Sequence, residues 1–65
     1  MKDPKRQRSF SGAADVAAHA EAAARYLKAL SAACASGDKA LARTTLRRAV
    51  SELQVAQALL RIGLE

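Results

Sequence analysis

The chain has 65 residues, of which 17 are alanine and only two, Phe10 and Tyr26, are aromatic. A chain this short with so few large apolar side chains can form one small domain, and association with another chain is expected to add to its stability. The longest run without a charged residue or histidine covers residues 29–37. That run is far shorter than the roughly 20 residues of a membrane-spanning helix. The composition therefore argues against a transmembrane protein and against an enzyme with a large enclosed active site.

The positive charge of the chain is concentrated at its start. The net charge is +5, and residues 1–12 hold four basic residues against one acidic residue. We interpret residues 1–10 as a flexible basic arm that either attracts an anionic partner or only aids solubility. A single cysteine, Cys34, excludes an internal disulfide and a cysteine-rich zinc site and is typical of a cytoplasmic protein. Residues 64–65 match what a common cloning junction leaves, and no inference depends on them.

Residues 12–35 predict a first α-helix. They contain no proline and many alanines, and alanine has the highest helix propensity. Ser11 is the expected N-cap, because its hydroxyl can accept a hydrogen bond from a free backbone N–H group. The Ser-Gly-Asp sequence at residues 36–38 predicts a turn. We expect Gly37 to end the first helix in a left-handed conformation and Asp38 to cap the next one.

Residues 39–62 predict a second helix, with Gly63 as its stop. Two helices of equal length joined by a short turn predict an antiparallel hairpin over residues 11–63. The predicted fold class is therefore all-α: a two-helix antiparallel hairpin that assembles into a dimeric four-helix bundle or is completed by partner helices. In layout it resembles the Rop-type plasmid copy-control bundle and the short helical-hairpin co-chaperones of bacterial secretion needles, and no motif carries either resemblance.

A heptad pattern predicts how the two helices pack. Small or apolar side chains recur in steps of three and four residues in both helices, and alanine recurs every seventh residue at Ala49 and Ala56. Small residues at this spacing let two backbones approach closely. The predicted seam consists of Val16, Ala20, Ala23, Leu27, Leu30 and Cys34 in the first helix and of Leu46, Ala49, Leu53, Ala56, Leu60 and Gly63 in the second.

The second helix has more apolar surface than one packing partner covers. On a helical wheel three apolar side chains of its second half cluster opposite Leu46, and a fourth from its first turn points the same way. We expect this group to bind another chain; the alternative is that these side chains stay singly exposed, as monomers tolerate. The predicted partner-binding residues are Leu41, Val55, Leu59 and Ile62.

These patterns favour a non-catalytic helical interaction module as the function: an adaptor, co-chaperone or assembly factor. Its expected partner is a second copy of the chain, a helical protein, or both. A small basic nucleic-acid-binding regulator is the alternative, because arginine binds phosphate through its forked donors. RNA is favoured over DNA because no DNA-reading helix arrangement is visible. The residues that would bind it are Lys2, Lys5, Arg6, Arg8, Arg43, Arg47 and Arg61.

Asp15, His19 and Tyr26 lie along one edge of the first helix and form the only group that resembles acid–base machinery. Asp15 could hold a ring nitrogen of His19 one turn away, but no nucleophile, second carboxylate or pocket accompanies them. We therefore expect a structural hydrogen bond there, and a buried, unreactive Cys34 on the seam. No enzymatic activity, metal site or cofactor is expected.

Overall fold

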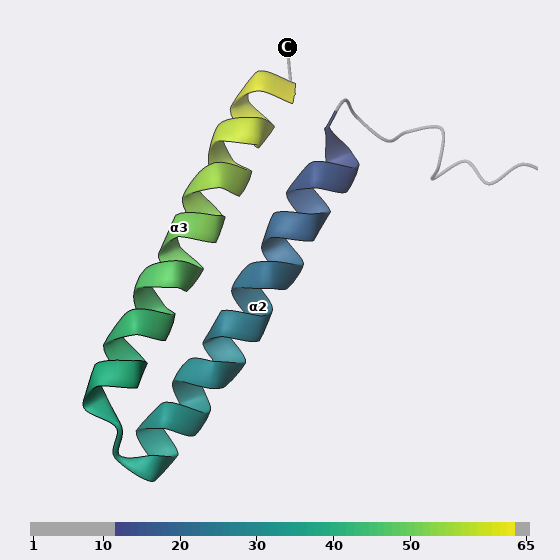
Figure 1. The fold of residues 1–65 in the computed structure, drawn as a ribbon. Coiled ribbons are helices and arrows are strands. Elements are labelled where there is room, and N and C mark those ends of the chain that lie inside the picture. The colour runs from purple at the N-terminus through teal and green to yellow at the C-terminus, as the bar shows by residue number, and fades with distance from the viewer. Residues whose placement is uncertain (1–11, 64–65) are drawn as a thin grey trace, which may run out of the picture.

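Two α-helices lie side by side in a computed structural model of the chain, which describes residues 12–63 (Figure 1). Helix α2 covers Ala13–Ser36 and helix α3 covers Lys39–Gly63. They run antiparallel, so the start of α2 and the end of α3 lie at one end of the hairpin and the turn at the other (Figure 1). The predicted all-α fold of two packed helices is confirmed. The predicted basic arm, the Ser11 cap and residues 64–65 lie outside the described residues.

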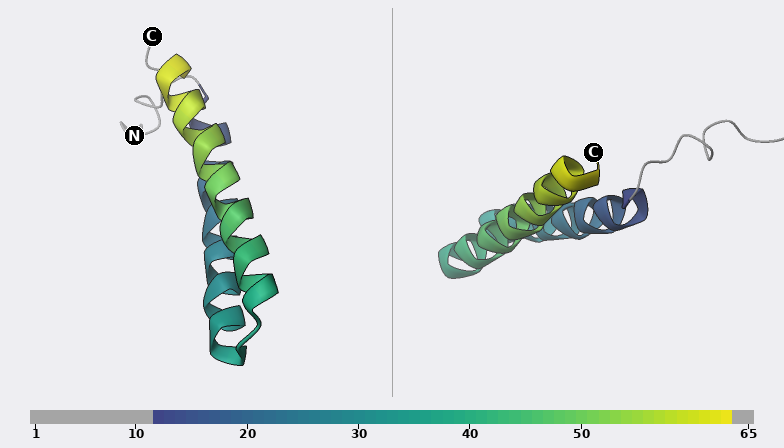
Figure 2. Two further views of the ribbon diagram at one scale, coloured as in Figure 1. Left: turned by 90° about the vertical axis from the view of Figure 1, so that its left-hand side faces the viewer. Right: turned by 90° about the horizontal axis from the view of Figure 1, so that it is seen from above.

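The hairpin is a single layer of two helices. From the side α3 lies in front of α2, and the two helix axes are inclined to each other (Figure 2). Neither helix is long and apolar enough to cross a bilayer, among the residues that the structure describes. Because no third element in residues 12–63 covers the pair, both broad sides of the hairpin are open to other molecules.

The turn between the helices has the predicted chemistry. Gly37 adopts a left-handed conformation with φ of +76°, which costs glycine little because it has no Cβ. The Gly37 amide donates to the Cys34 carbonyl oxygen at 3.1 Å and the Asp38 amide to that of Ala33 at 2.9 Å, which is the pattern of a Schellman motif. Asp38 Oδ1 then accepts a hydrogen bond from the Leu41 amide at 3.0 Å, so the predicted cap of the second helix is confirmed.

The contact between the helices is made by small side chains. In α3 the six residues with reduced exposure follow one another in steps of three and four, the spacing of a heptad seam. The four buried apolar residues of the described chain are all alanines, and no large side chain is completely buried. The α3 side of the seam consists of Ala42, Thr45, Ala49, Glu52, Ala56 and Leu59.

The predicted seam is right for one row of α3 and wrong for the other. Ala49 and Ala56 are buried as expected. The leucine row that should have joined them is exposed: Leu46 by 46%, Leu53 by 48% and Leu60 by 37%. The residues one position earlier, at 45, 52 and 59, take the place of the leucines.

The same shift occurs in α2. Ala23 is buried, and Val16 and Leu30 are half-buried, as the heptad pattern predicts. Leu27 is exposed by 44%, and Ala20 and Cys34 are exposed as well, so these three seam predictions are wrong. Their places at the seam are taken by the preceding residues His19, Tyr26 and Ala33.

Small and hydrogen-bonded side chains explain why the seam excludes the leucines. Thr45 is 6% exposed, but its hydroxyl donates to the carbonyl oxygens of Leu41 at 2.9 Å and Ala42 at 3.1 Å, so its burial leaves no polar atom unpaired. Glu52 is partly buried and bonds to α2. A leucine row at the seam would hold the backbones apart and break the contacts between alanines.

Candidate interaction surfaces

Three exposed leucines of α3 form a row along one broad side of the hairpin. Leu46, Leu53 and Leu60 are seven residues apart, and each follows a seam residue by one position. Val50 follows the seam residue Ala49 and extends this row. In α2 the exposed Leu27 is placed in the same way, directly after the seam residue Tyr26. We call this surface the leucine face; it consists of Leu27, Leu46, Val50, Leu53 and Leu60.

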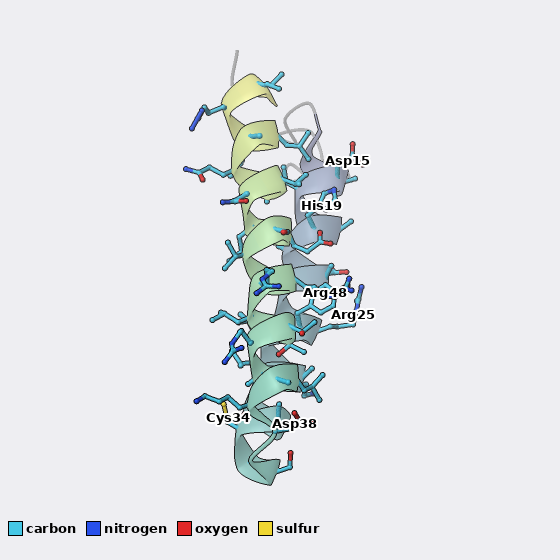
Figure 3. All side chains as sticks on the ribbon, turned by 60° about the vertical axis from the view of Figure 1, so that its left-hand side comes forward. Asp15, His19, Arg25, Cys34, Asp38 and Arg48 are labelled. Atoms are coloured by element: carbon cyan, nitrogen blue, oxygen red, sulfur yellow. The ribbon has the colours of Figure 1, made fainter. Side chains whose placement is uncertain are left out.

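Both helices contribute to the leucine face from the same side. Two antiparallel helices are related by an approximate twofold axis perpendicular to the pair, so side chains that follow the seam by one position project to the same side in each helix. Cys34, one heptad after Leu27, projects to this side near the turn (Figure 3). The α3 positions that follow the seam by one residue carry charged side chains only near the turn. These are Lys39, one heptad before Leu46, and Arg43, one heptad before Val50.

The predicted partner-binding residues lie away from the leucine face. Leu41, Val55 and Ile62 are 46%, 42% and 68% exposed and share one row of α3, in which Arg48 separates the first from the other two. Leu59 does not belong to this row. It is half-buried on the seam between the helices, one position before Leu60. The apolar surface on this side is therefore smaller than the helical wheel suggested.

A shallow groove of about 260 Å³ opens on this second side, between the helices. Arg48 and Arg25 project on the same side of the hairpin, away from Cys34 (Figure 3). Hydroxyl groups, guanidinium groups and one carboxylate surround the groove, so it can hold an anion through several donors. We call it the arginine groove; its lining is Tyr26, Thr44, Arg47, Arg48, Ser51 and Glu52.

The predicted nucleic-acid residues are only partly brought together. Arg47 lines the arginine groove, whereas Arg43 and Arg61 are exposed outside its lining. The four basic residues of the arm, at positions 2, 5, 6 and 8, lie outside the described part of the chain. Arg48 is absent from the predicted nucleic-acid residues, because a helical wheel of α3 alone places it on a different side from Arg43, Arg47 and Arg61. It faces the groove only because α2 supplies Tyr26 as the opposite wall.

His19 bonds across the hairpin instead of along its own helix. Its Nδ1 lies 2.6 Å from Oε1 of Glu52, and the carboxylate accepts this hydrogen bond. The two side chains are 37% and 26% exposed. His19 therefore forms a hydrogen bond between the helices, as part of a pair with Glu52. The expected partner, Asp15, is exposed one turn earlier on α2. In residues 12–63 no three His, Cys, Asp or Glu side chains gather as a metal site would require.

The hairpin thus presents two surfaces of opposite character, the uncharged leucine face and the arginine groove. The first suits another apolar helix surface, and the second suits an anion. Comparisons of the chain with protein-family models, with curated proteins and with solved structures find no match.

Proposed function

We propose that the protein is a non-catalytic helical interaction module, an adaptor, co-chaperone or assembly factor that packs its leucine face against helices of another chain. One observation carries this proposal: the hairpin buries alanines and leaves five of the seven leucines in residues 12–63 exposed. Burial contributes about 0.8 kcal/mol per CH₂ group, so a leucine gains far more from burial than an alanine does. Much of the apolar surface that this sequence could bury therefore stays exposed until a second chain covers it.

The arrangement of the leucines supports a four-helix bundle as the assembly. A helix in a bundle packs against more than one neighbour and needs an apolar stripe broader than a single seam. In α3 the leucine row lies directly beside the alanine row, so the two rows together form such a stripe. The bundle is either a dimer of this chain or a hairpin completed by partner helices.

The test compares two neighbouring substitutions in α3. Leu53→Asp puts a carboxylate in the middle of the leucine face, where an interface would desolvate it. Gln54→Asp puts the same charge one position further, where the native residue is already polar and exposed. We expect both variants to remain helical by circular dichroism, and only Leu53→Asp to lose assembled mass in light scattering or to lose a helical partner.

Two results would contradict this proposal. One is a wild-type chain that stays monomeric and binds no other helical protein. The other is a Leu53→Asp variant that assembles as the wild type does. Leu59→Asp is not a clean test, because Leu59 lies on the seam and its substitution acts on the hairpin itself.

RNA binding through the arginine groove is a second candidate function. Arg47 and Arg48 line the groove together with Ser51, so two guanidinium groups and a hydroxyl could donate to a phosphate backbone. The carboxylate of Glu52 also lines the groove, so one acidic group stands against the two guanidinium groups.

The salt dependence of RNA binding tests this candidate. Each neutralised phosphate adds about 0.7–0.9 to the slope of log K against log salt concentration. Replacing Arg47 and Arg48 by glutamine should therefore reduce the slope by roughly 1.4–1.8 if both contact phosphates. Arg61→Gln, outside the groove, is the matched control. The absence of binding to duplex or hairpin RNA at low salt would exclude this function.

A further inference from the structure

We infer that the chain docked on the leucine face is a second copy of this protein, turned end over end so that the two turns lie at opposite ends. This inference rests on the proposed function and names its partner. Three observations carry it: the symmetry of the leucine row, the distribution of charge along the hairpin and the size of the face.

The leucine row is complementary to its own copy. Leu46 and Leu60 each lie seven residues from Leu53, which is close to the middle of α3. When two copies meet with opposite directions, Leu53 comes near the twofold axis, and Leu46 of each copy comes beside Leu60 of the other. The same patch is then used by both partners, as in the isologous interface of a twofold dimer.

The charges of the described residues distinguish the two ends of the hairpin. The half next to the turn, residues 25–50, holds six basic side chains against Asp38 alone, a net charge of +5. The open half, residues 12–24 and 51–63, holds three acidic side chains against Arg61, a net charge of −2 with His19 neutral. Residues 1–11 and 64–65 are joined to this half and add +3 and −1, so its total charge is zero. If both copies had their turns at the same end, the two halves with a net charge of +5 would lie against each other and repel. Opposite turns set each basic half against the half of the partner that has no net charge, so this repulsion is avoided.

The leucine face is also large enough for a stable dimer. Helices of this length extend about 36 Å, and two adjacent helices are about 20 Å wide. One face therefore offers roughly 700 Å² per copy, or about 1,400 Å² for both, which is within the standard size of a specific interface. No charged residue interrupts its α3 row between Leu46 and Leu60.

The native cysteine allows the arrangement to be measured without any substitution. Cys34 is exposed and lies about one helical turn before the turn of the hairpin, whereas Leu53 lies fifteen residues beyond Asp38. At 1.5 Å per residue, Cys34 is about 18 Å from the level of Leu53. Two copies with opposite turns therefore place their Cys34 residues about 35 Å apart, and two copies with turns at the same end place them much closer.

The experiment combines light scattering with a distance measurement on the full chain. We expect twice the chain mass for the wild type and for Gln54→Asp, and the mass of one chain for Leu53→Asp. Spin labels on Cys34 should give a distance near 35 Å by double electron–electron resonance. In a Cys34→Ala background, Leu53→Cys should form an intermolecular disulfide on oxidation, because the two Cα atoms would come within about 7 Å. Val55→Cys, on the other side of α3, should not.

Several outcomes would overturn the inference. A wild type that is monomeric at all accessible concentrations would show that the partner is not a second copy. If Leu53→Asp also abolishes binding of another helical protein, the proposed function stands and only this inference fails. Binding of a monomer to vesicles of phosphatidylglycerol and phosphatidylcholine, lost in Leu53→Asp, assigns the face to a lipid surface. A short Cys34 distance overturns the end-over-end arrangement. A dimer that persists in Leu53→Asp places the interface elsewhere.

Discussion

His19 of α2 and Glu52 of α3 are joined across the hairpin by a hydrogen bond of 2.6 Å. Glu52 lies directly before Leu53, so the bond turns position 52, and not position 53, toward α2. A single polar pair thereby helps to fix the rotation of α3 about its own axis. The leucine face exists because of this rotation, since one residue of shift would place the leucines on the seam.

The first prediction concerns the strength of this pair. A double-mutant cycle with His19→Ala and Glu52→Ala should give a coupling of about 0.5–1 kcal/mol in the free energy of unfolding, the usual range for one hydrogen bond at a partly exposed site. Urea unfolding followed by circular dichroism measures it. The same cycle with Glu21→Ala, an exposed residue of α2, should show no coupling to His19. Equal couplings in both cycles would mean that the bond does not stabilise the hairpin.

The second prediction concerns the alanine seam. Ala49 is 1% exposed, so Ala49→Leu must push the helices apart or force strained rotamers. Overpacking of this kind costs about 1–3 kcal/mol. Ala58→Leu adds the same side chain at an exposed position of α3 and serves as the control. Thermal unfolding should show a lower midpoint for Ala49→Leu only; a stabilised Ala49→Leu would show that the seam holds unfilled space.

The third prediction concerns the turn. Gly37 has φ of +76°, and no atom within 4 Å would meet an added Cβ, so the cost of Gly37→Ala comes from the backbone conformation alone. A left-handed residue other than glycine costs about 1–2 kcal/mol. Gly37→Asn should lose less, because asparagine tolerates this conformation better. If urea unfolding gives the same stability for the alanine variant and the wild type, the turn has another conformation.

The helical hairpin was predictable from local sequence, whereas its register was not. Alanine-rich segments and the pair Gly37 and Asp38 act through interactions between residues close in the chain, which a sequence displays directly. The register required a choice between two adjacent rows of α3 that share Ala49 and Ala56. Hydrophobicity favoured the row with Leu53. The structure has the row with Glu52, because the alanine contact is too close for leucines and because Glu52 meets a residue 33 positions away.

The candidate surfaces follow from that same choice. A seam that contains the leucines leaves a different apolar surface without a partner, which is why the sequence predicted binding through Leu41, Val55, Leu59 and Ile62. The observed rotation moves Leu59 into the seam and brings the larger apolar surface to the other side. Arg48 could be placed in a groove only once Tyr26 of the other helix was known to lie opposite it.

The last prediction separates the seam from the leucine face with two adjacent leucines. Leu59 is half-buried between the helices, and Leu60 is 37% exposed on the leucine face. Leu59→Ala should destabilise the hairpin by about 2 kcal/mol, the low end of the range for leucine truncations. It should therefore lower the melting temperature by a similar amount at every protein concentration.

Leu60→Ala should act through association instead. In the proposed dimer it weakens binding between copies, so its melting temperature should approach that of the wild type at high concentration and fall below it on dilution. Melts by circular dichroism over a hundredfold range of concentration distinguish the two responses. If Leu60→Ala lowers the melting temperature equally at all concentrations, its side chain stabilises the hairpin alone. The leucine face would then contribute to folding and not to association.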